Sequence, residues 1–431
     1  MTQATKTIAT VHPLVKPIEA KVQVPGSKSF TNRALIVAAL ADGITTLQGA
    51  SDSNDSRILI TLLDRLGVEI IEQDGVVQVR GNGGKFDEFN GVLNVEDAGT
   101  VMRFLTALCS IVPGEITIEG SDRMNHRPIK ELVDALKKLG AEITYSDNDG
   151  YPPIKINGGT INGGNVHVNG NVSSQFVSAL LMIAPALSTD TEIVIDGEQV
   201  SEPYIDMTTS VMKEFGMDVE KSGKHYFVGG NKAYKGTKYK VEGDASAASY
   251  MLAIAALTQS KIAVTNVSAN SLQSDARFVK ILKQMGCTVG DKEYLEVTGT
   301  NTLKAIEVNM QTMPDTAQTL AVLAAFAKGE TIITGLKTLQ LKESKRITAL
   351  QMELEKMGIE CEAGNDFIKI KGGAPKAATI STYSDHRMAM AFAIAGMKVE
   401  GIGIESPEVV KKSYPGFWEA LKSIGVNVEM K

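Results

Sequence analysis

Charged and small polar side chains gather at the points of the sequence where helices are expected to begin. They are Lys28, Ser29, Arg33, Thr100, Arg103, Ser173, Ser174, Gln175, Asp315, Asp385, His386 and Arg387. The N-terminus of a buried helix presents unpaired N–H groups and the positive end of the helix dipole, so it attracts anions. Lysine and arginine suit phosphate and carboxylate ligands, and the acids among them can transfer protons. The pattern therefore predicts a site for anionic substrates.

Taken singly, several of these signals have a simpler explanation. The run Pro25–Ser29 resembles a phosphate-binding loop, but the full GxxxxGK[ST] pattern is absent because Ser27 precedes the lysine. Ser173 and Ser174 are more often helix caps than ligands. The run Asp385–Arg387 is harder to explain away, because three ionisable side chains at the head of an apolar helix are costly unless they are paired or used.

Further basic residues look like ordinary surface when each is taken alone. Lys342, Glu343 and Arg346 stand at helical spacing, for which a solvated, salt-bridged face is the usual explanation. The runs at 126–128 and 411–412 have no special feature of their own. Together with the helix starts, however, they complete the lysine- and arginine-rich set that phosphate and carboxylate ligands require.

One helical ending occurs six times along the chain: an amphipathic run, then glycine, then an apolar, strand-like alternation. The glycines are Gly67, Gly140, Gly216, Gly286, Gly358 and Gly425. They recur roughly every 70 residues, a spacing that indicates repeated architecture. Glycine just past a helix end supplies the left-handed conformation that terminates the helix. We therefore expect six similar units, each with one amphipathic helix.

An alanine-rich apolar helix is expected about 40 to 45 residues before each of these glycines, because the runs there have little polar face. The six runs begin at Gly26, Asp97, Ser173, Gly243, Pro314 and Ser384. A helix that is apolar all round must be surrounded by protein, so these six belong in the interior, under strands and the amphipathic helices.

Two short strands around a turn follow most of the amphipathic helices, so each unit is a βαβαββ repeat. The sixth unit ends at Lys431 without its hairpin, and the strand-like segment from Thr7 to Val24 is expected to complete it. The predicted fold class is α/β (α+β), with two similar domains of three repeats and buried parallel helices, an inside-out α/β barrel. The predicted domains are residues 25–241, and residues 243–431 together with 1–24.

Bulk composition agrees with this organisation. The 431 residues exceed the roughly 250 to 300 that one core supports, which favours two domains. Hydrophobic residues make up 43% and charged residues 22%, as in ordinary globular proteins. The formal net charge of −6 argues against a general nucleic-acid or anionic-membrane binder, because those partners select a basic surface. Any anion is therefore bound locally.

Cysteine usage and hydropathy predict the compartment. Cys109, Cys287 and Cys361 are far apart and form no CxxC pair, so we expect neither a disulfide framework nor a thiolate metal site. We see no signal peptide, and no segment reaches the roughly 20 apolar residues that span a bilayer. We expect a cytoplasmic monomer whose partners are small-molecule substrates, not nucleic acid or a membrane.

Ten stretches, in order and over essentially the whole chain, closely resemble the enolpyruvyl transferases that make 5-enolpyruvylshikimate 3-phosphate. They are VPGSKSFTNRALIVAALADG, DAGTVMRFL, RMNHRPI, GNVSSQFVSALLMIAP, SEPYID, EGDASAASY, PDTAQT, LKESKR, YSDHRMAM and KKSYPGFW. The resemblance implies transfer of an enolpyruvyl group from phosphoenolpyruvate to the 5-hydroxyl of shikimate 3-phosphate, with no cofactor. It also implies two domains of three βαβαββ units, which the glycine spacing already predicts, and competition between glyphosate and phosphoenolpyruvate.

The resemblance implies two sets of substrate contacts. The residues matched to shikimate 3-phosphate are Lys28, Ser29, Arg33, Ser173, Ser174, Gln175, Ser201, Asp315 and Lys342. The residues matched to phosphoenolpyruvate are Lys28, Gly99, Arg127, Gln175, Arg346, Arg387 and Lys412. The catalytic candidates are Asp315, Glu343, Lys28 and His386. We assign Asp315 to accept the proton of the attacking hydroxyl and Glu343 to protonate the methylene carbon, and the opposite assignment stays open.

Three positions depart from the family pattern. Asp97 and Thr338 stand where relatives often have Asn, and Phe104 stands where many have Pro. None of these changes removes a charged group that the chemistry needs, but Thr338 is left out of the predicted site.

Two other functions compete with this interpretation. The sister transferase acting on UDP-N-acetylglucosamine commonly carries a cysteine in the loop before its Arg-Pro, and residues 121–126 contain none. A non-catalytic anion-binding protein could use the same helix ends, but it would not need Glu343 and Asp315 beside the basic residues.

Overall fold

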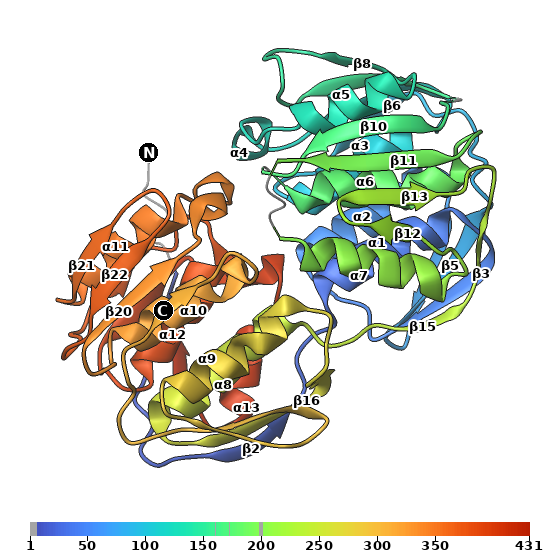
Figure 1. Ribbon diagram of the computed structural model, residues 1–431. Coiled ribbons are helices and arrows are strands. Elements are labelled where there is room, and N and C mark those ends of the chain that lie inside the picture. The colour runs from blue at the N-terminus through green and yellow to red at the C-terminus, as the bar shows by residue number, and fades with distance from the viewer. Residues whose placement is uncertain (1–6, 160, 172, 198–200) are drawn as a thin grey trace. The chain divides into compact units, whose positions relative to one another are not determined.

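The computed structural model describes residues 7–159, 161–171, 173–197 and 201–431, which divide into two compact units (Figure 1). Unit 2 is Gly26–Glu242, and unit 1 is Gly243–Lys431 together with the amino-terminal segment up to Pro25. Within the described ranges, no helix combines the length and the apolar composition that crossing a bilayer requires.

Unit 2 contains three sheets of one design, in which a parallel strand pair is extended by an antiparallel hairpin. The first sheet has, in hydrogen-bonded order, β14 (Tyr234–Lys235), β3 (Ala41–Gln48), β5 (Val76–Asn82) and β4 (Glu69–Gln73), with β15 (Lys238–Lys240) also on β3. The second has β6 (Gly91–Asn94), β7 (Gly114–Glu119), β9 (Ile154–Gly158) and β8 (Glu142–Tyr145). The third has β10 (Gly164–Asn169), β11 (Thr191–Asp196), β13 (His225–Val228) and β12 (Glu220–Ser222). The last strands of the unit, β14 and β15, thus supply the parallel partner of β3.

The helices of unit 2 fall into the two expected kinds. The apolar, almost wholly buried helices are α1 (Lys28–Ala39), α3 (Gly99–Cys109) and α6 (Ser174–Ile183), which pack on one another. The amphipathic helices are α2 (Asn54–Arg65), α5 (Lys130–Lys138) and α7 (Pro203–Glu214). Two short elements, α4 (Asp122–Asn125) and the 3-10 helix η1 (Ala184–Ala186), complete the unit. In Figure 1 the strands β10, β11 and β13 form a layer over α6.

Unit 1 repeats the same design in its own three sheets. The fourth sheet has β17 (Thr288–Val289), β18 (Tyr294–Thr298), β16 (Lys261–Ser268) and β2 (Glu19–Val22). The fifth has β19 (Glu307–Asn309), β20 (Glu330–Thr334), β22 (Ile368–Lys371) and β21 (Glu360–Ala363). The sixth has β23 (Thr379–Ile380), β24 (Ile402–Glu405), β1 (Ile8–Val11) and β25 (Val428–Met430).

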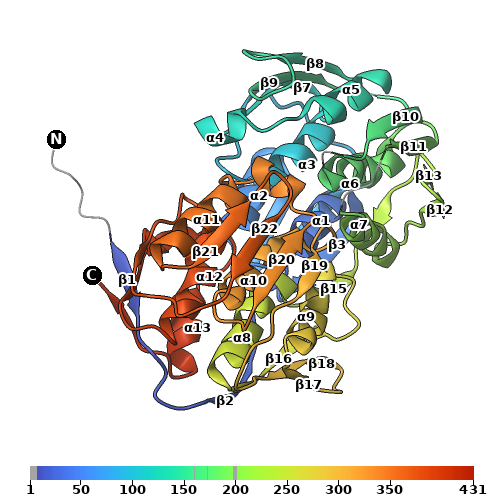
Figure 2. The same cartoon turned by 60° about the vertical axis from the view of Figure 1, so that its left-hand side comes forward.

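The amino-terminal strands join two different sheets, as Figure 2 shows. β1 pairs antiparallel with β24 and β25, so it completes the last repeat as predicted. β2 pairs in parallel with β16 of the fourth repeat, so the expectation that the whole segment serves the last repeat is wrong for β2. The reason is that the chain enters unit 1 at Gly243 and begins a helix at once, which leaves the fourth repeat without a first strand of its own.

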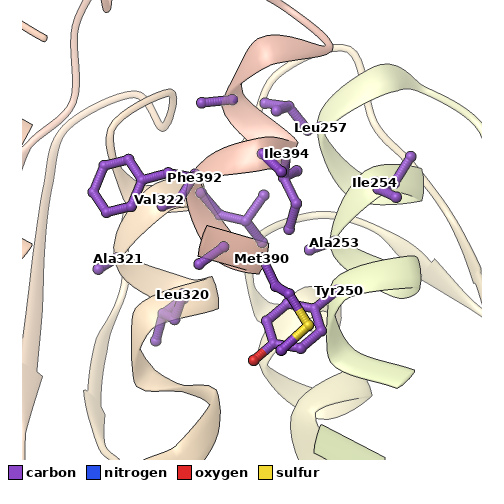
Figure 3. Close-up of a cluster of buried hydrophobic side chains, with 14 of the residues drawn as sticks. Tyr250, Ala253, Ile254, Leu257, Leu320, Ala321, Val322, Met390, Phe392 and Ile394 are labelled. Atoms are coloured by element: carbon purple, nitrogen blue, oxygen red, sulfur yellow. The ribbon is translucent and has the colours of Figure 1, made fainter. Parts of the chain in front are cut away.

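Unit 1 is centred on three apolar helices, α8 (Ala245–Thr258), α10 (Ala317–Ala324) and α12 (His386–Gly396). Figure 3 shows side chains of these three helices meeting in the core, among them Ile254, Leu320 and Phe392. The amphipathic helices are α9 (Phe278–Gln284), α11 (Arg346–Lys356) and α13 (Phe417–Ser423). The 3-10 helices are η2 (Ser274–Arg277), η3 (Pro314–Thr316), η4 (Lys337–Leu341) and η5 (Pro407–Lys412).

The six glycines that predicted the repeats all have a left-handed backbone. Their φ angles lie between 76° at Gly358 and 103° at Gly286, a region that glycine enters without a steric penalty. Each glycine follows the end of an amphipathic helix, which confirms the predicted helix ends.

Candidate active site

In unit 2 the first predicted residue, Lys28, begins α1, with Ser27 as the cap of that helix. The Lys28 ammonium donates to Oδ2 of Asp55 at 2.9 Å, a partner that was not predicted from the sequence. A Cβ on Gly26 would lie 1.9 Å from the carbonyl oxygen of Gly49. The glycine is therefore required by close backbone packing, which accounts for the likeness to a phosphate-binding loop.

Arg33 is buried farther along the same helix. Its Nε donates to Oγ1 of Thr208 at 2.7 Å, and its Nη2 donates to Oγ of Ser178 and to the carbonyl of Tyr204, both at 3.2 Å. The ring of Phe104, one of the departures from the family pattern, has its centre 5.4 Å from the guanidinium carbon. Burial lowers the pKa of Arg33 to about 10. Arg33 thus holds α1, α6 and α7 together, and its predicted substrate contact stays a prediction.

The starts of α3 and α6 are joined by a hydrogen bond. Ser173 caps α6 by accepting from the N–H of Gln175 at 3.2 Å, and Ser174 is buried. Nε2 of Gln175 donates to Oγ1 of Thr100 in α3 at 3.2 Å. The predicted ligands on these two helices therefore belong to one cluster.

Gly99 and Arg127 lie in direct contact at the start of α3. A Cβ on Gly99 would meet Nη1 of Arg127 at 2.5 Å and its Cζ at 2.8 Å. Nε of Arg127 is buried and has no hydrogen-bond partner among the described residues. A buried donor of a charged group is costly to leave unpaired, so an anionic ligand that accepts this bond would be favoured. Asp97 accepts a hydrogen bond from Ser121, in the loop that leads to Arg127.

Ser29 and Ser201, the remaining predicted residues of unit 2, accept hydrogen bonds through their backbone carbonyls. The carbonyl of Ser29 accepts from Nη1 of Arg33 at 2.9 Å. Ser201 precedes α7 with a φ of 55°, and its carbonyl accepts from the N–H of Tyr204 at 3.1 Å. The substrate contacts of Ser29 and Ser201 stay predictions.

In unit 1 seven charged side chains form one ion-pair network. They are Asp315, Lys342, Glu343, Arg346, Asp385, Arg387 and Lys412. Arg346 lies at its centre with 1% of its side chain exposed. Its Nε is 2.7 Å from Oδ2 of Asp385, its Nη1 is 3.1 Å from Oδ1 of Asp315, and its Nη2 is 2.8 Å from Oε2 of Glu343. The two proton-transfer candidates are therefore connected through a single guanidinium.

Three more cations complete this network. Nη2 of Arg387 lies 2.8 Å from Oδ2 of Asp315, and Nζ of Lys342 lies 3.7 Å from Oδ1 of the same carboxylate. Nζ of Lys412 lies 3.3 Å from Oε1 of Glu343. Asp315 and Glu343 are thus each flanked by at least two cations, and Arg346 is buried between them instead of lying on a solvated helix face.

The charges of this network shift the pKa values of its members. Burial would raise the pKa of Asp315, but Arg387, Lys342 and Arg346 outweigh it and hold that pKa well below its ordinary value. Burial would lower the pKa of Arg346, but Asp385, Glu343 and Asp315 outweigh it and raise that pKa. Asp315 is therefore ionised within this network.

Asp385, which the sequence marked as costly without giving it a role, orders the start of α12. Its Oδ1 accepts from the N–H of Arg387 at 3.0 Å, and its Oδ2 accepts from Oγ of Ser344 at 2.9 Å. His386 is buried, with Nδ1 3.8 Å from Oδ1 of Asp385. The structure therefore gives Asp385 the orienting role at this helix start, and the catalytic role of His386 stays a prediction.

Asp275, which the sequence did not mark at all, is buried in η2 and accepts a hydrogen bond from Ser246 at the start of α8. Burial, and then the charge of Asp315, raises the pKa of Asp275 to about 7. Among the described residues, no group of three or more His, Cys, Asp or Glu side chains is arranged to hold a metal ion.

Comparison with known proteins identifies the family of this chain. The profile of the family described as EPSP synthase (3-phosphoshikimate 1-carboxyvinyltransferase) matches residues 14–421. The chain belongs to the EPSP synthase family. It is 44% identical over 429 residues to 3-phosphoshikimate 1-carboxyvinyltransferase of Pasteurella multocida, covering 96% of this chain and 97% of the relative. The relative of the same name from Pectobacterium atrosepticum is 43% identical over 420 residues, with 96% and 97% covered.

The structural comparison gives the same family. An EPSP synthase structure from Acinetobacter baumannii superimposes with a TM-score of 0.85 at 28% identity, covering 99% of this chain and 100% of that one. A second structure from the same organism gives a TM-score of 0.83 at 27% identity. The predicted α/β fold class is therefore confirmed.

Proposed function

We propose that this chain transfers the enolpyruvyl group of phosphoenolpyruvate to the 5-hydroxyl of shikimate 3-phosphate, giving 5-enolpyruvylshikimate 3-phosphate and phosphate. Membership of the EPSP synthase family over residues 14–421 supports this reaction. The observation that carries it in the structure is the network of four cations and three carboxylates in unit 1. Such a network both holds anions and supplies groups for proton transfer. The reaction belongs to the shikimate pathway, which leads to chorismate and the aromatic amino acids.

The reaction requires addition followed by elimination. The 5-hydroxyl oxygen bonds to the central carbon of phosphoenolpyruvate while the hydroxyl loses its proton and the methylene carbon gains one. The tetrahedral intermediate then breaks its bond to the phosphate oxygen and releases a proton from the new methyl group, which restores the enol double bond. The enzyme must therefore bring two anions together and move protons to and from defined atoms.

The cations of the site answer the first requirement. Lys28, Arg127, Arg346, Arg387 and Lys412 are the proposed ligands of phosphoenolpyruvate. Fixed positive charge lowers the repulsion between two anionic substrates and needs no reorganisation during the reaction. The Nε of Arg127 supports this assignment, because no described residue accepts its hydrogen bond and a ligand oxygen would do so. For shikimate 3-phosphate we propose the serines and Gln175 at the start of α6, together with the other residues matched to that substrate.

The carboxylates answer the second requirement. We propose that Asp315 accepts the proton of the attacking hydroxyl and that Glu343 protonates the methylene carbon. Within the ion-pair network the neighbouring cations hold the pKa of Asp315 well below its ordinary value, so it is a weak base. Anionic substrates that draw Arg387, Lys342 and Arg346 into their own contacts would raise this pKa and strengthen Asp315 as a base. Binding of both substrates would in this way make Asp315 a stronger base.

Two further properties are proposed with this function, a monomeric state and a cytoplasmic location. The scattered cysteines support a reducing compartment, since Cys109 and Cys287 are buried and all three described cysteines are free. Sedimentation of the purified protein would test the oligomeric state.

Phosphate release tests the reaction directly. The purified enzyme is mixed with phosphoenolpyruvate and either shikimate 3-phosphate or UDP-N-acetylglucosamine, and inorganic phosphate is measured over time. We expect release that depends on shikimate 3-phosphate. Release only with the nucleotide sugar would instead assign the sister reaction, and release with neither acceptor would contradict enolpyruvyl transfer.

A further inference from the structure

A turn with an uncommon backbone precedes α12. The N–H of Asp385 donates to the carbonyl of Thr382 at 2.8 Å, and the two residues between them, Tyr383 and Ser384, both have a φ of 54°. Positive φ at both central positions is the pattern of the type I′ turn, which Asn and Gly normally occupy. A bulky side chain such as tyrosine is strained there, and such strain persists only where the surrounding structure enforces it.

Glu353 of α11 forms hydrogen bonds to the residues at the start of this turn. Its side chain is fully buried. Oε1 accepts from the Tyr383 hydroxyl at 2.5 Å, and Oε2 accepts from the backbone N–H of Ser381 at 3.1 Å. Nζ of Lys356, 2.8 Å away, balances the buried charge. Both oxygens of this carboxylate therefore accept hydrogen bonds, and two of the three donors belong to the segment 381–383. Hydrogen bonds to a buried charged group are strong, so Glu353 can hold this segment in place.

The position of Glu353 on its helix relates it to the ion-pair network. Glu353 follows Arg346 by seven residues on α11, which is two turns, so both side chains lie on one face of the helix about 10 Å apart along its axis. Arg346 holds Asp385 at the end of the turn, and Glu353 holds Ser381 and Tyr383 at its beginning. Helix α11 therefore contacts both the beginning and the end of the strained turn.

We propose that Glu353 is a positioning residue for the enolpyruvyl transfer. It keeps the 382–385 turn in its strained form, so that Asp385 stays where it orders both Arg346 and the start of α12 with Arg387. Without Glu353 the turn relaxes to an ordinary backbone, and these two cations lose the arrangement in which they are proposed to hold phosphoenolpyruvate. This inference rests on the proposed function.

The first test is Glu353→Gln, which keeps the volume of the side chain but places an NH2 group among groups that are all donors. If the correct turn is then occupied only about a tenth of the time, the apparent KM for phosphoenolpyruvate rises about tenfold. We expect kcat and the KM for shikimate 3-phosphate to change much less. Tyr383→Phe, which removes one hydrogen bond and keeps the ring, should give a smaller rise. Glu355→Gln, an exposed change on the same helix, is the matched control and should leave both constants unchanged.

The second test restores the turn by another route. Glycine adopts a positive φ without strain, so Ser384→Gly in the Glu353→Gln background should bring the KM for phosphoenolpyruvate back towards the wild-type value. Hydrogen exchange of the Asp385 amide gives a readout that does not depend on the reaction. That amide should exchange faster in Glu353→Gln than in wild type, and more slowly again in the double variant.

The outcomes separate the possible failures. Wild-type enzyme that releases no phosphate with shikimate 3-phosphate contradicts the proposed function, whatever the exchange data show. Active wild type together with a Glu353→Gln variant of unchanged KM and unchanged Asp385 exchange overturns the positioning role. A variant with less folded protein, an unchanged KM and no rescue by Ser384→Gly overturns it as well, because that is the behaviour of a residue needed only for stability.

Discussion

Replacing Gly99 with alanine places a methyl group in the space of the Arg127 guanidinium. The new Cβ would lie 2.5 Å from Nη1 of Arg127 and 2.8 Å from its Cζ and Nη2. The neighbouring backbone accepts alanine, because Gly99 opens α3 and its φ is not positive. The guanidinium must therefore retreat by about 1 Å to reach ordinary van der Waals contact.

The size of the effect follows from this displacement. Overpacking by one methyl group costs about 1 to 3 kcal/mol, which is about 5- to 150-fold in affinity at 1.4 kcal/mol per factor of ten. If glyphosate occupies the phosphoenolpyruvate contacts, both ligands use Arg127 and both weaken. We expect the inhibition constant of glyphosate to rise more than the KM for phosphoenolpyruvate, because the larger ligand reaches closer to the wall at Gly99.

The assay is inhibition of phosphate release by glyphosate at several phosphoenolpyruvate concentrations, in wild type and in Gly99→Ala. Gly416→Ala is the matched control, because a Cβ there meets nothing within 4 Å. In an Arg127→Ala background, adding Gly99→Ala should change inhibition little if the effect passes through the guanidinium. An unchanged ratio of inhibition constant to KM in Gly99→Ala would refute this reasoning. A wild type indifferent to millimolar glyphosate would refute the expected sensitivity and leave the reaction itself untouched.

Three other changes are expected to act at separate points of the site. Glu343→Gln should lower turnover by roughly 100-fold while shikimate 3-phosphate still binds, as loss of a general acid or base does; near-normal turnover would leave Glu343 with a purely ionic role. Arg127→Ala should mainly raise the KM for phosphoenolpyruvate, because it removes a charge-assisted contact, and a fall confined to kcat would contradict this. Burial and the charge of Asp315 raise the pKa of Asp275 from 3.8 to about 7. Between these two pH values the folded state therefore binds one more proton than the unfolded state. The free energy of unfolding should then fall as the pH rises through this range. Asp275→Asn should remove that slope in denaturant unfolding at pH 5 and pH 8, whereas Asp291→Asn, an exposed change, should retain it.

Much of the fold was predictable because it depends on local signals. Glycine after a helix and an unbroken apolar face are properties of short segments, so Gly67 and its five counterparts located the helix ends and α8 was recognised as buried. The partner of β2 was not predictable in the same way. Pairing of β2 with β16 depends on which sheet lacks a parallel strand, and that follows only from the three-dimensional path of the chain.

The residues of the candidate site show the same contrast between local signals and tertiary contacts. The charged residues at helix starts could be found from their type and position, and the structure joins Asp315, Glu343 and Arg346 as direct neighbours. Asp55 and Glu353 could not be found, because each is one acid among many in the sequence and becomes special only through its burial and its partners. Residue type predicts which groups can do the chemistry, whereas the groups that orient them are identified by tertiary contacts.

The pairing of β1 and β2 has a consequence for synthesis of the protein. Both strands are made before unit 2, but β2 can pair only after β16 has been made, and β1 only after β24 and β25 have been made. Unit 2 is a continuous segment, Gly26–Glu242, and all of its strand partners are present once Glu242 has emerged. Since domains generally fold as units during translation and distant pairings form slowly, unit 2 folds while the first strands of unit 1 stay unpaired. The strands β1 and β2 are thus made before unit 2 but pair after it, and the ion-pair network of unit 1 is assembled only after the chain up to Lys412 has been made.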